Sequence, residues 1–271
     1  MTLWQGLCHL PTSWHPPMGR LLGKFLLIVA KDRKKIAQAN ISLCLSNLSS
    51  DDQKKILSNN FALLGKSIIE TGIAWFWSDA KIEKFIDYEI FGLDLLSIEN
   101  STKGNLIIFK HSQHLELDAR LLAINAEVYG VSRSHNSASM NKIQNKGRLS
   151  SIKGTADKDN PRKFIKWLKN GKNVLYAIDQ DYGWDNSAKL KFFNQETATI
   201  TTPKKIIDIT GSNLLFMNSF YEKNKIVLKL EALNSFGIDN KGLSQKINDF
   251  MEEKILLHPA EYLWAHRRYK S

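Results

Sequence analysis

The chain of 271 residues contains little cysteine: Cys8 and Cys44 are the only two, and they stand apart in the sequence. Two isolated cysteines provide neither a disulfide framework nor the Cys-x-x-Cys spacing of a zinc site. Such a cysteine content is typical of proteins that keep their thiols reduced. We therefore expect the folded chain to be exposed to the cytosol.

Long apolar runs are also absent. The longest, "FLLIVA" at positions 25–30, has six residues, whereas a helix that crosses a bilayer needs about 20. Prolines at positions 11, 16 and 17 interrupt the place where the apolar core of a signal peptide would lie. Residues 1–35 instead combine aromatic, leucine and basic side chains, namely Trp4, Trp14, Leu21, Leu22, Lys31, Arg33, Lys34 and Lys35. This pattern is typical of a helical segment at a membrane interface, although an amphipathic core helix with a solvated basic end shows it too.

Acidic side chains are outnumbered: 27 of them stand against 38 lysines and arginines, which leaves a net charge of +11. Such a surplus favours an anionic partner, which could be nucleic acid, a phosphorylated glycolipid, an acidic carrier protein or an anionic membrane leaflet. Charge alone does not choose among these. With 43% apolar residues, a chain of this length can form one large core, so we expect a single domain over residues 1–271.

The order of apolar patterns predicts an α/β fold. Residues 19–78 place apolar side chains three and four apart, and "SSDD" at 49–52 supplies a helix N-cap. Short strand-like runs follow at 105–109, 128–132, 173–178, 213–220 and 225–233, with helical patterns between them. A long amphipathic helix and a basic aromatic tail end the chain. We expect a largely parallel central sheet flanked by helices and preceded by a helical N-terminal region.

The stretch "KHSQHLELD" at 110–118 packs two histidines and two carboxylates directly after a predicted strand. In open α/β sheets the carboxyl ends of the strands face the ligand, so this is a suitable place for a catalytic base. Two pairings compete here. His114 and Asp118 are four apart and would share a helix face as a solvated pair, whereas His111 could reach Glu116 only from the turn before the helix. Spacing alone favours the first pairing.

The sequence resembles the bacterial secondary acyltransferases of lipid A biosynthesis, which include lauroyl and myristoyl transferases. The His-x-x-x-x-Glu block of that family is similar to residues 105–122, where His111 and Glu116 have this spacing. Further blocks resemble the family's in order, namely "ETGIAWFW" (70–77), "NKGRLSS" (145–151), "VLYAIDQDYG" (174–183), "TATITT" (197–202) and "PAEYLWAHRRYK" (259–270). The resemblance implies a fold like that of the glycerolipid acyltransferases.

The resemblance also implies roles for individual residues. His111 would be the base, Glu116 the carboxylate that orients it, and Arg148 and Asp179 would occupy the family's other functional positions. Without the family, Asp179 is more simply a cap at the end of a strand, and Arg148 a solvated cation. Trp75 and Trp77, in an apolar setting, are expected in the core.

The reaction implied by the resemblance is a direct acyl transfer without a cofactor. His111 would take the proton of a hydroxyl on a 3-hydroxyacyl chain of a lipid A precursor, and that oxygen would attack the thioester of an acyl-acyl-carrier protein. Arg148 and backbone N–H groups would stabilise the oxyanion. No Gly-x-Ser-x-Gly turn or cysteine lies near the block, so a covalent acyl-enzyme is not expected.

The anionic partners that the resemblance implies would account for the surplus of basic over acidic side chains. Asp179, Asp181 and Arg133 are candidate substrate-binding residues, and cations that could contact phosphates or an acidic carrier protein are Arg133, Arg148, Lys163, Arg267 and Arg268. Residues 1–35 would hold the enzyme on the cytoplasmic face of the inner membrane.

Two other functions stay open. A glycerolipid acyltransferase also uses a histidine followed by a carboxylate, usually Asp rather than Glu. A nucleic-acid-binding protein would suit the charge alone, but the chain has no recognisable binding module, so nucleic acid is not expected as a partner.

Overall fold

A central sheet organises the computed structural model, which describes residues 3–97, 103–132 and 137–270. Within these ranges seven strands pair in the order β1-β9-β8-β2-β5-β3-β4. Their bounds are Tyr88–Phe91 (β1), Asn105–Phe109 (β2), Val128–Ser132 (β3), Thr155–Asp157 (β4), Asn173–Ala177 (β5), Asn213–Glu222 (β8) and Lys225–Ala232 (β9). A separate antiparallel hairpin consists of β6, Ser187–Phe192, and β7, Gln195–Ile200.

The sheet is largely parallel, as the sequence predicts. Strands β8, β2, β5, β3 and β4 run in one direction, and β9 and β1 run in the other because β8 and β9 form an antiparallel hairpin. β2 is buried at all five residues, which is the pattern of a parallel strand covered on both faces. The five predicted strands are confirmed, and β1, β4, β6 and β7 are strands that the prediction did not include.

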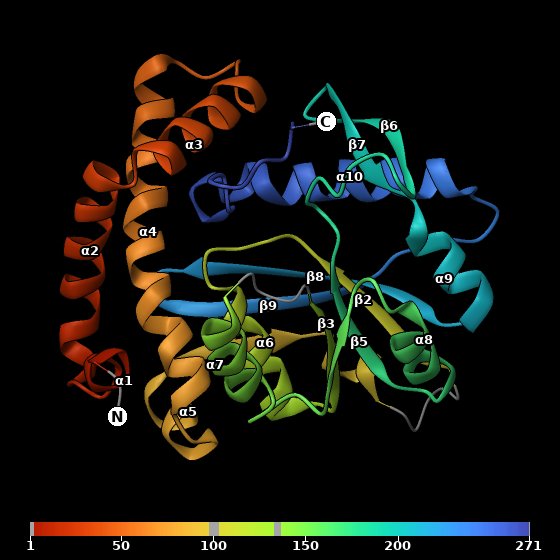
Figure 1. Cartoon of the computed structure of the whole chain (residues 1–271), viewed down its shortest axis with the longest axis horizontal. Coiled ribbons are helices and arrows are strands. Elements are labelled where there is room, and N and C mark those ends of the chain that lie inside the picture. Colours follow the sequence, from red (N-terminus) through yellow and green to blue (C-terminus); the bar gives the residue numbers. More distant parts are fainter. Residues whose placement is uncertain (1–2, 98–102, 133–136, 271) are drawn as a thin grey trace.

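Helices cover both faces of the sheet (Figure 1). One face packs against α8 (Pro161–Lys169), α9 (Thr202–Thr210) and α10 (Asn240–Leu257), and its core contains Leu106 and Ile108 of β2. The opposite face packs against α5 (Asp79–Phe85) and α6 (Leu115–Asn125), and its core contains Ile107 and Phe109. Alternate residues of β2 therefore enter two different cores, as the side-chain period of a strand requires.

A helical region precedes the sheet, which confirms the prediction for the N-terminal part of the chain. It comprises α1 (Leu3–Cys8), α2 (His15–Val29), α3 (Lys31–Cys44) and α4 (Ser50–Phe76). Ser49 caps α4 by accepting a hydrogen bond from the backbone N–H of Asp52. The 27 residues of α4 reach both cores, because its first half packs in one and its second half in the other.

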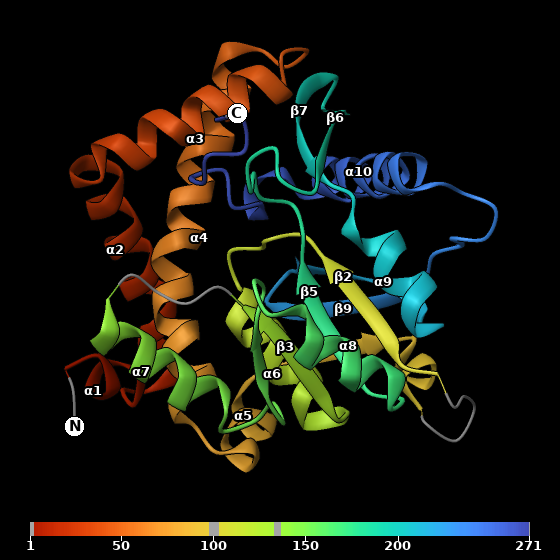
Figure 2. The same ribbon diagram turned by 45° about the vertical axis from the view of Figure 1, so that its right-hand side comes forward.

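Helix α2 lies against the outer side of α4 (Figure 2). The contact is close because glycines face each other: a Cβ added to Gly23 would lie 2.4 Å from the carbonyl oxygen of Phe61, and one added to Gly65 would lie 2.2 Å from that of Gly19. Trp4, expected at a membrane interface, is half-buried and donates its indole N–H to the Ile68 carbonyl at 2.9 Å. Among the helices of the described ranges, none has the length and apolarity to span a membrane.

Candidate active site

A cavity of about 270 Å³ opens at the carboxyl ends of β2, β3 and β5. Polar groups of His111, Glu116, Arg148 and Gln180 lie in its wall, together with apolar side chains that include Phe109, Leu115, Val131, Ile152 and Leu175. This is the end of a parallel sheet where ligands bind in open α/β folds. A largely apolar cavity with a few polar groups suits a substrate with a long hydrocarbon part.

The register of the sheet brings His111 and Asp179 together. Phe109 of β2 pairs with Ala177 of β5, and the histidine and the aspartate each lie two residues beyond these strand ends. Nδ1 of His111 lies 2.5 Å from Oδ1 of Asp179, and the backbone N–H of His111 donates to Oδ2 at 2.9 Å. His111 precedes α6, as predicted, and its side chain is 14% exposed.

The environment of Asp179 fixes which nitrogen of His111 can act as a base. Burial acts to raise the pKa of Asp179, but the charge and hydrogen bonds of His111 outweigh it and hold this pKa below its usual value. An ionised carboxylate only accepts hydrogen bonds, so Nδ1 of His111 carries the hydrogen. In the neutral ring Nε2 therefore keeps its lone pair, and the amide nitrogen of Gln180 lies 3.1 Å from it.

Glu116 has a different partner from the one predicted. Its carboxylate forms a two-pronged ion pair with Nε and Nη2 of Arg148, which is the last residue of α7 (Ala138–Arg148). The same carboxylate accepts the indole N–H of Trp75 at 2.8 Å. In this structure Asp179, rather than Glu116, contacts Nδ1 of His111, and the orienting role expected of Glu116 stays a prediction. Arg148 lies in the cavity wall.

His114 does not line the cavity, and its pair with Asp118 is not the solvated pair that the spacing predicted. Nδ1 of His114 lies 2.6 Å from Oδ1 of Asp118, and both side chains are almost fully buried. Nε2 lies 3.1 Å from Oε2 of Glu261, in the 3-10 turn Pro259–Glu261. The helical spacing of His114 and Asp118 is therefore correct, and tertiary packing removes the pair from solvent.

The remaining predicted residues have varied positions. Asp181 does not line the cavity, and its carboxylate accepts the backbone N–H groups of Gly183 at 2.8 Å and Lys270 at 3.2 Å. Arg268 is buried and donates to Thr197, Ala198 and Thr199, so the expectation that it contacts phosphate is wrong. Lys163 donates to the Thr155 carbonyl at 2.8 Å, and Arg267 is exposed. Arg133 lies outside the described residues.

Three residues near the site were not predicted to act there. Gln180 contacts His111, Trp75 holds Glu116 although it was expected in the core, and His266 has its ring centroid 6.0 Å from that of His111. Burial lowers the pKa of His266 to about 4, although Asp179 acts to raise it. His266 is therefore neutral at pH 7. Within the described ranges, no three His, Cys, Asp or Glu side chains are arranged to hold a metal ion.

Comparisons with known proteins point to one family. The model of the family described as bacterial lipid A biosynthesis acyltransferase matches residues 1–271. The chain is 30% identical over 260 residues to the lipid A biosynthesis palmitoleoyltransferase of Escherichia coli strain K12, which covers 94% of this chain and 84% of that protein. It is 31% identical over 264 residues to the lauroyltransferase of the same strain, with the same coverage. A lipid A biosynthesis acyltransferase of Haemophilus influenzae is 30% identical over 279 residues, covering 100% of this chain and 89% of that protein.

Proposed function

The chain belongs to the bacterial lipid A biosynthesis acyltransferase family and is an acyltransferase, and we propose that it moves a fatty acyl chain from acyl-acyl-carrier protein to a lipid A precursor. The acceptor group would be the hydroxyl of a 3-hydroxyacyl chain. The observation that carries the proposal is His111 in the wall of a largely apolar cavity, with its Nδ1 held by the buried carboxylate of Asp179.

His111 acts as the general base in this proposal. Nε2 has the lone pair, and the acceptor hydroxyl would replace the Gln180 amide in contact with it. As Nε2 takes the proton, the hydroxyl oxygen attacks the thioester carbon, and the ionised carboxylate of Asp179 stabilises the imidazolium that forms. Collapse of the tetrahedral intermediate releases the carrier thiol, which regains a proton from His111. The transfer is direct and needs no cofactor.

We propose that Arg148 stabilises the oxyanion of the tetrahedral intermediate. Its Nε and Nη2 are bound to Glu116, which leaves Nη1 outside this pair. The pair fixes the guanidinium in the cavity wall, and a fixed donor stabilises developing charge better than a mobile one does. Glu116 would therefore serve catalysis by holding Arg148, and Trp75 by holding Glu116.

Exposed side chains of α2 support our proposal that the enzyme lies at the cytoplasmic face of the inner membrane. Leu21, Phe25 and Ile28 are spaced four and three apart on one side of this helix, and they are 70%, 57% and 72% exposed. Exposed cations accompany them, namely Arg20, Lys24, Lys31 and Lys35. Exposed apolar side chains beside cations suit the headgroup region of an anionic leaflet. We propose that this face of α2 contacts the membrane that contains the acceptor.

The proposed reaction can be tested with purified protein and alternative substrates. Acyl-acyl-carrier protein or acyl-coenzyme A is offered as donor, and a lipid A precursor or a lysophospholipid as acceptor, with products identified by mass spectrometry. We expect transfer from the carrier protein to the precursor, and a loss of roughly 10²- to 10⁴-fold in His111→Ala. Transfer to the lysophospholipid alone would support a glycerolipid acyltransferase instead. Wild-type activity in His111→Ala would exclude the proposed mechanism.

Membrane contact can be tested with two matched pairs of substitutions. Leu21→Ser with Phe25→Ser removes apolar side chains from α2, and Leu256→Ser with Leu257→Ser removes side chains that are 54% and 64% exposed at the end of α10. We expect the first pair to weaken sedimentation with anionic vesicles and the second to leave it unchanged. Equal sedimentation of both variants would argue against α2 as the contact.

A further inference from the structure

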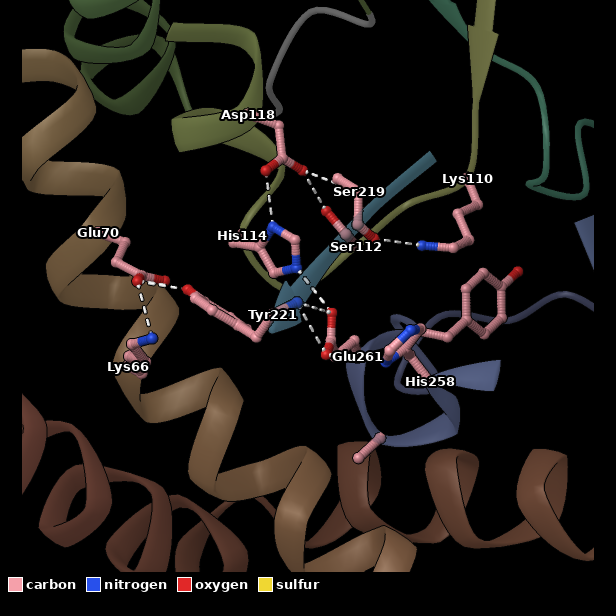
Figure 3. A network of polar contacts seen from close by, with 12 residues as sticks. Lys66, Glu70, Lys110, Ser112, His114, Asp118, Ser219, Tyr221, His258 and Glu261 are labelled. Atoms are coloured by element: carbon pink, nitrogen blue, oxygen red, sulfur yellow. Dashed lines mark hydrogen bonds and ion pairs between the residues drawn. The ribbon is translucent and has the colours of Figure 1, made fainter. Parts of the chain in front are cut away.

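A cluster of buried charges adjoins the loop that bears His111 but lies outside the cavity. We call Lys110, His114, Asp118 and Glu261 the charge cluster; Lys110, His114 and Asp118 are at most 2% exposed, and Glu261 is 7% exposed. Figure 3 shows the contacts that connect its members and their neighbours on other elements. The reaction proposed above uses none of these four side chains.

Asp118 connects the loop, α6 and the sheet. Its Oδ2 accepts the hydroxyl groups of Ser112 in the loop and Ser219 in β8, each at 2.7 Å, and its Oδ1 accepts Nδ1–H of His114 (Figure 3). Lys110 donates to the carbonyl oxygen of Ser219 at 3.0 Å. The cluster is therefore anchored to a central strand of the sheet.

Glu261 extends the cluster to the C-terminal part of the chain. Its carboxylate accepts Nε2–H of His114, and both of its oxygens accept the backbone N–H of Tyr221 at 3.1 Å. Because both nitrogens of His114 face carboxylates, both carry hydrogens and the ring is an imidazolium. The cluster then holds the imidazolium of His114 between two carboxylates, and burial lowers the pKa of the neighbouring Lys110 despite the attraction of Glu261, Asp118 and Asp179.

Other charged and titratable groups surround the cluster. The ring of Tyr221 packs on that of His114 with centroids 4.7 Å apart, and its hydroxyl donates to Glu70 of α4, which also pairs with Lys66 at 3.3 Å. His258 lies on the other side of Glu261, with Nδ1 3.7 Å from Oε1. Although burial acts to lower it, the pKa of His114 is raised to about 9 by Asp118 and Glu261.

Backbone hydrogen bonds beside the charge cluster connect His111 to the C-terminal segment. The N–H of Gln113 donates to the carbonyl of Glu261 at 2.8 Å, and the N–H of Leu263 donates to the carbonyl of His111 at 3.0 Å. Ser112 and Tyr262 form an antiparallel bridge between these bonds. The backbone of His111 is thus bonded to the C-terminal segment through its carbonyl and to Asp179 through its N–H.

We propose that the charge cluster is a positioning device for the base: it fixes the loop 110–114 against residues 259–263 and thereby sets where Nε2 of His111 points. Buried ion pairs contribute little net stability compared with apolar packing, but they are directional. A directional clamp is valuable here because a misplacement of about 1 Å at a reacting group can cost roughly 100-fold in rate. His114, Asp118 and Glu261 are positioning residues in this inference, which rests on the proposed role of His111.

The test compares single and double substitutions in the acyl-transfer assay, well below each melting temperature. His114→Gln and Glu261→Gln each unbalance the cluster, and the double variant removes one charge of each sign. We expect each single variant to lower kcat roughly 10- to 100-fold with little change in KM, and the double variant to recover part of the loss. His258→Gln is the matched control, because His258 also faces Glu261 but makes no bond to the loop; its kcat should stay unchanged.

Ser219→Ala gives a second test if the charge variants do not fold, because it removes a single hydrogen bond to Asp118 from outside the loop. A roughly threefold to tenfold lower kcat is expected. If folded Glu261→Gln, His114→Gln and Ser219→Ala keep the wild-type kcat and lower only the melting temperature, the cluster is merely structural and the inference fails. His111→Ala is measured in parallel: if it is active, the proposed function fails as well, and if it is inactive, only the positioning role is overturned.

Discussion

Two histidines, three residues apart in the chain, differ in the groups that their ring nitrogens face. His111 has one carboxylate, Asp179, on Nδ1 and the displaceable amide of Gln180 at Nε2. His114 has Asp118 on Nδ1 and Glu261 on Nε2. One carboxylate fixes the tautomer of a neutral ring and leaves a lone pair for catalysis, whereas two carboxylates require both nitrogens to donate. The number of acceptors around each ring therefore separates the proposed base from a buried cation.

The two aspartates that hold these rings differ in what else they accept. Asp179 accepts a ring N–H and the backbone N–H of the same histidine, so it fixes the orientation of one residue. Asp118 accepts His114 and two serine hydroxyls from different segments, so it joins parts of the fold. We expect the loss of the first carboxylate to lower activity mainly, and the loss of the second to lower stability and also, through the loop 110–114, kcat.

The largest expected effect is that of Asp179→Asn on catalysis. An asparagine amide at this position would donate to Nδ1 of His111 and so shift the ring hydrogen to Nε2, which removes the lone pair from the cavity. We expect kcat to fall roughly 10³- to 10⁴-fold, measured by acyl transfer at saturating substrate. Asp179→Glu, which keeps the charge, is the comparison variant and should retain more activity. Equal activity of wild type and Asp179→Asn would refute the assignment of Asp179 as the orienting carboxylate.

Asp118→Asn should have the next largest effect, a loss of folding stability in addition to the lower kcat that its positioning role implies. Removing one partner of a buried ion pair leaves His114 with an uncompensated charge, which costs about 3–5 kcal/mol of unfolding free energy. Denaturant unfolding measures this loss. The control is Glu196→Gln, in a surface pair with Lys189 whose side chains are 62% and 61% exposed, where the loss should be about 0.5 kcal/mol or less. Similar losses in both variants would contradict the role of Asp118 as the buried partner of a charged His114.

The third expected effect is a pH dependence from His114. Its folded pKa of about 9 lies above the ordinary value of 6.5, so its stabilising contribution is complete below about pH 6.5 and is lost as the pH rises through about 9. We expect the melting-temperature difference between wild type and His114→Gln to shrink over this range, by on the order of 5 °C. Because both proteins contain Lys110, whose pKa burial lowers despite nearby carboxylates, its titration largely cancels in the difference. A difference that is constant with pH would show that His114 is not charged.

Local sequence patterns were sufficient to predict much of the fold. The runs at 105–109 and 128–132 have the bounds of β2 and β3, because each is a block of apolar and β-branched residues between polar ones. The strands that were not predicted are short or rich in polar residues: β1 has four residues and β4 three, β6 alternates lysine with apolar side chains, and β7 alternates threonine with apolar side chains. β6 and β7 form a hairpin outside the sheet. Their strand character comes from pairing rather than from composition.

The partners within the site depended on distances that local patterns do not contain. His111 was predicted correctly before α6, but Asp179 is 68 residues away and reaches it only through the register of β2 with β5. Glu261 is 147 residues from His114. One signal was available: His111 and Asp179 each follow an apolar strand by two residues, and neighbouring parallel strands would bring such positions together. The pair of Glu116 and Arg148 had no comparable signal.

The smallest expected effect distinguishes two roles for Glu116. If it acts through Arg148, Glu116→Gln should weaken a two-pronged ion pair but leave the tautomer of His111 unchanged, so kcat should fall only about tenfold. Arg148→Lys loses the same two-pronged geometry and should have a similar effect, and the double variant should be little worse than either single one. Kinetics of the three variants, with histidine NMR to follow the His111 tautomer, make the measurement. Glu116→Gln could instead match Asp179→Asn in rate and in the tautomer of His111. In that case His111 would depend on two carboxylates during turnover. His111 and His114 would then differ in when each carboxylate contacts the ring, rather than in how many carboxylates there are.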